Sequence, residues 1–324
     1  MKVKTIELYI GPSIDLDVAV GKDYIEPSIG FDGLIYFLRP LDEEAYNEFI
    51  LKEHPIQKPC DFEVVILKGE HTEILTVKDQ MQPYRYVQPL PNHRFLLVNA
   101  RSTYDGNGTF VKNAKVLKRE GNELKTVREF LMGDGISHVY TTEMGTIWTG
   151  YFDEGVFGNM GWGDPDAKEP RDPVGMSGVI KWNLKGEKLF ENTQADIADC
   201  YAMNVISDHE VWFYYYDVFK LAHLKNGVFK EFDPNFESSN DFIVNDTHVL
   251  MRVDHIFQLY EIQGDHLKLV ARIHLVNEHE KKMGVANSTI DVRGNRLIFL
   301  SRHYLYDVTL DEIVELAKEM LEDE

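Results

Sequence analysis

Six segments of the chain share one pattern of hydrophobic and polar positions. Each has a polar opening and a short strand, then a tight turn and a strand rich in apolar and aromatic residues. The segments are centred on residues 32–37, 92–97, 144–149, 208–213, 246–251 and 294–299. Repeats of about 40 to 50 residues built from short strands are typical of propellers. The pattern therefore predicts an all-β fold, a six-bladed β-propeller.

Equivalent positions in the six segments are Tyr36, Leu96, Trp148, Trp212, Leu250 and Ile298. Some intervals between these positions are longer than a blade, so the chain must carry insertions. Residues 41–59 read as a short helix and loop, and residues 158–178 are rich in Gly, Pro and Asp, as loops are. Two stacked β-sandwiches are the alternative architecture, and they explain the period less well.

Apolar hairpins follow most of the six segments. The clearest span residues 179–190, 221–232 and 258–270, which gives four antiparallel strands per repeat. The last repeat supplies only three, so we expect the N-terminal strand Ile6–Ile10 to lie beside Tyr304–Val308 and close the ring. The predicted domain covers residues 1–310. A C-terminal helix over residues 311–324 is expected to pack outside it, with Ile313, Leu316, Ala317 and Met320 on its apolar face.

The composition predicts a soluble, cytoplasmic protein. Apolar residues make up 44% of the chain, but no apolar run approaches the roughly 18 residues that span a bilayer. The first seven residues alternate like a strand and lack the apolar stretch of a signal peptide. Cys60 and Cys200 stand outside any CxxC or CxxH spacing, which favours two buried free thiols in a reducing compartment.

A net charge of −20 narrows the choice of partners. So acidic a surface repels phosphate backbones and anionic lipid headgroups, which argues against nucleic acid and membranes. A small polar molecule or a peptide is the expected partner, although part of the acidity serves solubility.

The loops after Trp148 and Trp212 point to a binding site. Both carry an aromatic residue, then an acid, then an apolar residue, and tyrosines with carboxylates suit a sugar, a cation or a peptide amine. Loops that enter the innermost strands should lie on the same face. Packing of the aromatics between sheets is the alternative. The predicted ligand-binding residues are Arg85, Asp134, His138, Tyr151, Asp153, Glu154, Asp199, Tyr201, Tyr214 and Asp217.

Residues 133–138 followed by 145–148 resemble the repeat unit of the lactonase-like six-bladed propellers, which include senescence-marker-type gluconolactonases and streptogramin-lyase-like proteins. The string 150–159, with 199–204 later, is similar to bacterial propeller proteins of unassigned function. The lactonase resemblance implies a divalent cation such as Ca²⁺. Its matching ligands would be Glu26, in Ile25–Glu26–Pro27–Ser28, and Asp134, before Gly135.

The chain contains no GxSxG, HExxH or glycine-rich phosphate motif. His138 and Asp134 form only a weak candidate acid–base pair. We therefore expect a propeller that binds a small polar or cationic ligand at the mouth of its channel. A metal-dependent lactonase-like hydrolase and a protein-interaction scaffold are the alternatives, and the sequence leaves open whether the chain is an enzyme.

Overall fold

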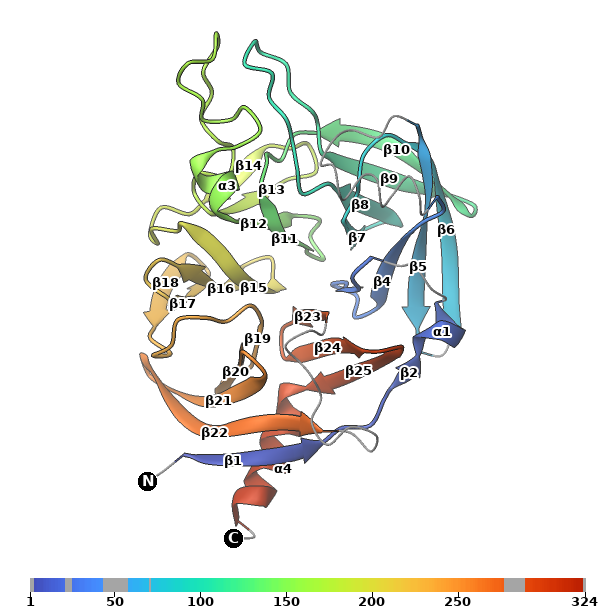
Figure 1. Ribbon diagram of the computed structural model, residues 1–324. Coiled ribbons are helices and arrows are strands. Elements are labelled where there is room, and N and C mark those ends of the chain that lie inside the picture. Colours follow the sequence, from blue (N-terminus) through green and yellow to red (C-terminus); the bar gives the residue numbers. More distant parts are fainter. Residues whose placement is uncertain (1–2, 21–24, 43–57, 70, 277–288, 323–324) are drawn as a thin grey trace. The chain divides into compact units, whose positions relative to one another are not determined.

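The computed structural model describes residues 3–20, 25–42, 58–69, 71–276 and 289–322 (Figure 1). The chain forms two compact units. The middle unit is Val20–Cys200, and the terminal unit combines Met1–Ala19 with Tyr201–Glu324. In both units the regular structure is mainly β-strand. Residues 43–57 contain most of the predicted insertion at 41–59 and lie outside the described residues.

The middle unit contains an eight-stranded sheet and a four-stranded sheet. The larger sheet consists of β3 (Ser28–Ile29), β4 (Ile35–Pro40), β5 (Cys60–Lys68), β6 (His71–Gln80), β7 (Tyr86–Leu90), β8 (Arg94–Val98), β9 (Ala114–Glu120) and β10 (Glu123–Phe130). The smaller sheet consists of β11 (Ile136–Thr141), β12 (Ile147–Tyr151), β13 (Val179–Trp182) and β14 (Lys188–Glu191). A short helix, α3 (Asp153–Phe157), follows β12.

The terminal unit contains three sheets. One consists of β15 (Asp199–Ser207), whose first two residues belong to the middle unit, with β16 (Glu210–Tyr216), β17 (Lys220–Lys225) and β18 (Val228–Phe232). The second has β19 (Phe242–Val244), β20 (His248–Val253), β21 (Ile256–Gln263) and β22 (His266–Val276), with β1 (Lys4–Tyr9) at its edge. The third has β23 (Ile290–Arg293), β24 (Arg296–Ser301), β25 (Tyr304–Thr309) and β2 (Ile14–Asp15), and the helices are α1 (Leu16–Ala19) and α4 (Leu310–Glu322).

The strand pattern predicted from the sequence is confirmed. The six equivalent positions fall in β4, β8, β12, β16, β20 and β24, each the second strand of an antiparallel series. The predicted hairpins are β13–β14, β17–β18 and β21–β22. Apolar and aromatic residues form strands here because both faces of these second strands are buried, as in Ile147–Tyr151.

The predicted count of six separate blades is not confirmed. Within the described residues, four sheets have four or five strands, the size of a propeller blade, and one sheet has eight. The large sheet forms because β6 and β10 meet in parallel at Thr76 and Glu123. The Thr76 N–H donates to the Asn122 carbonyl at 2.8 Å, so two antiparallel series become one sheet.

The N-terminal strand lies elsewhere than predicted. Ile6–Ile10 was expected beside Tyr304–Val308, but β1 pairs in parallel with β22, with Leu8 opposite Leu275. The last sheet is completed by β2 instead, where Ile14 pairs with Leu305. The edge of β22 is long enough to pair with all six residues of β1. This register buries Ile6 and Leu8 in the core of the terminal unit.

Helix α4 packs on the same core. Thr309 and Glu312 cap it reciprocally, since the Glu312 carboxylate accepts from the Thr309 N–H at 2.8 Å and the Thr309 hydroxyl accepts from the Glu312 N–H at 3.3 Å. Ile313 and Ala317 are buried as predicted, together with Leu310 and Val314. Leu316 and Met320 were also expected on the buried face, but they are 38% and 45% exposed because the helix is rotated toward Val314.

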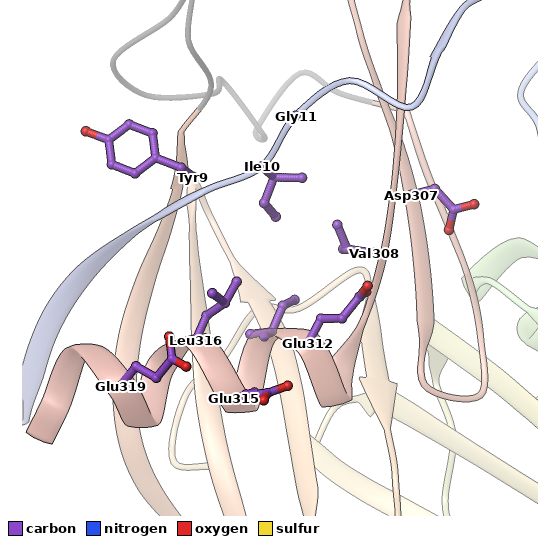
Figure 2. Close-up of a pocket in the computed structure, with 10 residues that line it drawn as sticks. Tyr9, Ile10, Gly11, Asp307, Val308, Glu312, Glu315, Leu316 and Glu319 are labelled. Carbon is purple, nitrogen blue, oxygen red and sulfur yellow. The ribbon is translucent and has the colours of Figure 1, made fainter.

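Beside α4 lies a cavity of about 350 Å³, which Figure 2 shows with the segment after β1 above the helix. Ile10, Val308 and Leu316 line it, with Glu315 and Glu319 at its edge. No helix among the described residues is long and apolar enough to cross a membrane. Cys60 and Cys200 are both buried and free, which confirms the prediction for the thiols.

Candidate functional site around the short helix α3

The turn before β11 is fixed from two sides. Asn113 is fully buried, and its amide donates to the carbonyls of Asn99 and Gly133 while its oxygen accepts from the Met132 N–H, all within 2.9 Å. The Tyr151 hydroxyl donates to the Met132 carbonyl at 2.5 Å. This turn carries Asp134, so the predicted site residue has a rigid support.

Two glycines allow this turn to touch α3. Gly135 has a φ of +70°, and a Cβ there would lie 2.3 Å from the Gly155 nitrogen. A Cβ on Gly155 would lie 2.6 Å from the Asp134 carbonyl oxygen. The Phe152 N–H donates to the Gly135 carbonyl at 2.9 Å, which joins the start of α3 to the turn. Only residues without a side chain permit so close an approach.

Asp134 lies beneath this contact, with only 3% of its surface exposed. Its Oδ1 accepts the Ser102 N–H at 2.8 Å and lies 3.2 Å from Arg101 Nε. Its Oδ2 is buried and has no hydrogen-bond partner. Arg101 in turn places Nη1 2.5 Å from Glu154 Oε2 on α3. Arg101 thus bridges a buried carboxylate and a partly exposed one.

Arg101 is held by packing as well as by charge. Its guanidinium carbon lies 5.5 Å from the centre of the Phe152 ring, a cation–π distance. The neighbouring loop is anchored by Trp162, whose indole N–H donates to the Ser102 carbonyl at 2.8 Å and whose ring lies 5.0 Å from that of Tyr104. The loops after β8 and β12 therefore pack together above the site (Figure 1).

Two further carboxylates meet at the start of α3. Asp153 is exposed, and its Oδ1 accepts the Glu154 N–H at 2.7 Å. Asp199, the first residue of β15, is half-buried beside it and takes a hydrogen bond from the Asp153 backbone. Neither carboxylate has an ion pair within the part of the chain that the structure describes.

The environment shifts the ionisation of these groups. Burial and the charge of Asp153 raise the pKa of Asp199 to about 6, against the Asp153 backbone hydrogen bond that lowers it. Burial likewise raises the pKa of Asp134 to about 6, despite the Ser102 N–H and Arg101. Burial also acts on Glu154, but hydrogen bonds from Asn159 and Arg101 outweigh it and leave the pKa of Glu154 lowered. The raised pKa values of Asp134 and Asp199 show that keeping these carboxyl groups ionised is unfavourable in the folded protein.

His138 serves the scaffold of the site. Its Nε2 lies 3.1 Å from the Cys200 carbonyl oxygen, which can only accept, so Nε2 carries the proton. The Ser137 hydroxyl donates to the same carbonyl at 3.3 Å, and the Tyr86 hydroxyl donates to the Ser137 carbonyl at 2.9 Å. Within the middle unit, these bonds join Tyr86 on β7 to Ser137 on β11, and both Ser137 and His138 to the Cys200 carbonyl. Nothing pairs His138 with Asp134.

Other predicted ligand-binding residues occupy different surroundings. Tyr151 and Tyr214 are fully buried, and each donates its hydroxyl to a backbone carbonyl, so their rings belong to the cores. Tyr201 and Asp217 lie in the terminal unit, where the Tyr201 ring stacks on Tyr216 at 5.9 Å and Asp217 is exposed. The aromatic walls expected for the pocket are therefore packing residues at positions 151 and 214.

The two residues implied as calcium ligands each face an arginine. Glu26 lies 3.2 Å from Arg85 Nη2, with both side chains about half exposed, and Asp134 faces Arg101. Calcium takes six to eight oxygen ligands, and a guanidinium beside each carboxylate opposes it. Among the described residues, no group of three or more His, Cys, Asp or Glu could hold a metal ion. This donor set does not fit the implied cation.

Sequence reasoning missed Arg101, Asn113 and Trp162. The signal is present in the sequence, because Arg101 follows Leu96 in the same type of loop as the one that follows Trp148. Applying the rule to every second strand would have brought the loop after β8 into the site. Asn113 gives no such signal, since an isolated asparagine does not reveal that its amide is buried.

Comparisons with known proteins concern the fold. The sequence model of the YxzG family matches residues 174–307, less than half of the chain. No curated protein matches. Virginiamycin B lyase from Staphylococcus aureus aligns with a TM-score of 0.50 and 11% identity, over 90% of this chain and 82% of its own.

Two further solved structures align less closely. Regucalcin, a calcium-binding protein from Agrobacterium tumefaciens, gives a TM-score of 0.46 and 11% identity over 94% of this chain and 95% of its own. U3-55K gives 0.48 and 12% over 87% and 79%. At such identities only the fold is informative. The likeness to the lyase supports an all-β, propeller-like arrangement of sheets with a short C-terminal helix.

Proposed function

We propose that the chain binds a small cationic or polyhydroxylated ligand at the carboxylates around α3. One observation carries the proposal: Asp153 and Asp199 lie together with no counter-ion within the described residues, and the pKa of Asp199 is raised to about 6. Two like charges held side by side are unfavourable unless a cation or several donors join them. A ligand amine would supply the positive charge that these two carboxylates lack.

The surrounding residues suit this role. Asp153 and Glu154 stand at the exposed side of α3, while Asp134 is the buried floor. Arg101 contacts Asp134 and Glu154 but carries only one positive charge. The group of four carboxylates therefore keeps a net negative charge. Charge-assisted hydrogen bonds from an amine are about twice as strong as neutral ones, and they would supply most of the specificity.

We also propose that the complete arrangement is a six-bladed propeller of the lactonase-like type. The eight-stranded sheet supports this count because it divides at Thr76 and Glu123 into two antiparallel series, each with its own repeated segment. The site then lies where loops after second strands meet loops before first strands, as the repeat predicts. The alternatives to ligand binding, a metal-dependent hydrolase and a protein scaffold, are separate outcomes of the experiment below.

The experiment is a thermal-shift screen of purified protein against polyamines, amino acids, sugars, lactones and divalent metals. A ligand that binds only the folded state at 100 times its Kd adds about 2.7 kcal/mol of stability, which raises Tm by roughly 5 °C. We expect an amine to give this rise, and Asp153→Asn or Asp199→Asn to abolish it. Asp172→Asn is the matched control, because Asp172 is an exposed acid in the connection between α3 and β13.

Three results would reject the proposal. The first is a response that both site variants retain. The second is lactone hydrolysis that depends on added metal, which would favour the hydrolase. The third is no response to any probe together with specific capture of a protein partner, which would favour the scaffold.

A further inference from the structure

A second site of opposite character lies in the terminal unit. A groove of about 280 Å³ is bounded by the β15–β18 sheet on one side and by the ends of β19 and β21 on the other. One row of paired residues crosses its wall: Trp212 on β16 pairs with His223 on β17, which pairs with Lys230 on β18. Successive strands place these three side chains on one face.

The wall is aromatic. The Trp212 and His223 rings stack at 3.7 Å between centroids, and the Trp212 and Phe232 rings stack at 5.5 Å. Trp212 and Phe232 are only 4% and 3% exposed, so the ring that the groove presents is that of His223, whose side chain is 15% exposed. Val244 and Ile262 provide an apolar surface opposite. Small-molecule sites are typically lined in this way, with an apolar body and a few polar groups that fix orientation.

Most charges in the groove are already matched. Glu210 accepts from His223 Nε2 at 2.9 Å and pairs with Lys225 Nζ at 2.9 Å. Asp246 also lies close enough to Lys225 to raise the pKa of that lysine, after the larger effects of Glu210. Burial lowers the pKa of His223, so the imidazole is neutral at pH 7. Lys225 is thus paired with Glu210 and lies within the electrostatic reach of Asp246.

Lys230 is the exception. It is exposed, lines the groove next to the ring of His223, and has no ion pair or hydrogen bond within the described ranges. The groove therefore offers a ligand an aromatic wall and one uncommitted positive charge. The α3 site differs, because its cation, Arg101, is already bound between Asp134 and Glu154.

We propose that this groove binds a small aromatic anion, with its ring over His223, which stacks on Trp212, and its carboxylate or phosphate on Lys230. Binding here is independent of the α3 site, since the two sites attract ligands of opposite charge. Because the His223 ring lies against Trp212, a ligand over His223 changes the surroundings of the indole, which provides an optical signal.

Tryptophan fluorescence of the full chain tests the proposal, with phenylacetate as the anionic probe and phenethylamine as its cationic counterpart at equal ionic strength. We expect phenylacetate to change the emission saturably and phenethylamine to have no saturable effect. Lys230→Gln should weaken phenylacetate binding about fivefold or more, because it removes the charge-assisted contact. Lys185→Gln, an exposed turn lysine, is the control and should leave binding unchanged.

Trp212→Phe should remove the optical signal while a thermal shift with phenylacetate persists, which separates loss of the reporter from loss of the fold. Equal responses to both probes, unchanged binding in Lys230→Gln, or a linear response without saturation would each overturn the proposal. Failure of phenylacetate to bind leaves the amine screen of the α3 site unaffected, so the two proposals fail separately.

Discussion

Two glycines decide whether the α3 site can form. A Cβ at Gly135 would collide with the backbone of Gly155, and the Gly135 φ of +70° already disfavours other residues. Gly135→Ala should destabilise the protein by several kcal/mol, because the new methyl group collides with backbone that cannot move aside. The measurement is chemical denaturation of the variant.

Gly121→Ala is the matched control. Gly121 has a similar φ of +66°, but nothing lies within 4 Å of the position a Cβ would take. It should cost only the conformational strain of about 1–2 kcal/mol. Equal losses in the two variants would show that the contact between the turn and α3 is absent.

Arg101 compensates the charge of Asp134. Arg101→Gln should lower the free energy of unfolding at pH 7.5 by about 3–5 kcal/mol, as expected when one partner of a buried ion pair is removed. The pKa of Asp134 is raised from 3.8 to about 6 in the folded state, so its burial costs the full amount above about pH 6, and this cost falls as the pH drops toward 3.8. The deficit should therefore shrink as pH falls from 7.5 to 5.

Adding Asp134→Asn to Arg101→Gln provides the internal check. The double variant removes both charges and should recover much of the lost stability at pH 7.5. Urea melts of the wild type, Arg101→Gln, Asp134→Asn and the double variant at both pH values give the coupling free energy between the two residues. A deficit that persists at pH 5, or that the second substitution deepens, would contradict the ion pair.

At the residue scale, the sequence pointed to the acidic residues but not to the ion pairs and hydrogen bonds that they make. Acids in loops are ordinary ligand groups, so the sequence points to Asp134, Asp153, Glu154 and Asp199, and the structure places them around α3. The tyrosines at 151 and 214 were chosen by the same pattern and are buried. Loop composition cannot tell a ring that faces a ligand from one that faces a sheet, because burial depends on neighbours distant in sequence.

Among the elements, β1 separates a buried face from an exposed one. Ile6 and Leu8 are its buried positions, and Glu7 between them is exposed. Leu8→Ala should cost about 2–5 kcal/mol because it leaves a cavity in the core beneath α4. Glu7→Ala should change stability by no more than about 0.5 kcal/mol.

Denaturant melts compare the two β1 variants directly. A negligible loss in Leu8→Ala would mean that β1 does not pack on β22. The sequence predicted the two faces of this strand correctly from alternation, but it assigned the wrong neighbour. Alternation fixes which residues point inward, whereas the choice between the edges of β22 and β25 depends on tertiary contacts.

Across the whole molecule, the repeat in the sequence predicted the antiparallel series and their second strands. It could not predict that β6 and β10 join, because pairing between outer strands leaves no mark on either hydrophobic pattern. The chain's charge of −20 acts at this scale too, since a negative field raises the local concentration of cations at any acidic site. That field favours the amine ligand proposed for α3.

Titration calorimetry with spermidine at pH 5 and pH 7.5 tests the central claim most directly. The pKa of Asp199 is raised to about 6, so roughly a tenth of this carboxyl is ionised at pH 5 and nearly all at pH 7.5. Protons compete with the amine, and we expect binding to be about tenfold tighter at pH 7.5, with this difference lost in Asp199→Asn. Affinity that is equal at the two pH values, or tighter at pH 5, would contradict the account.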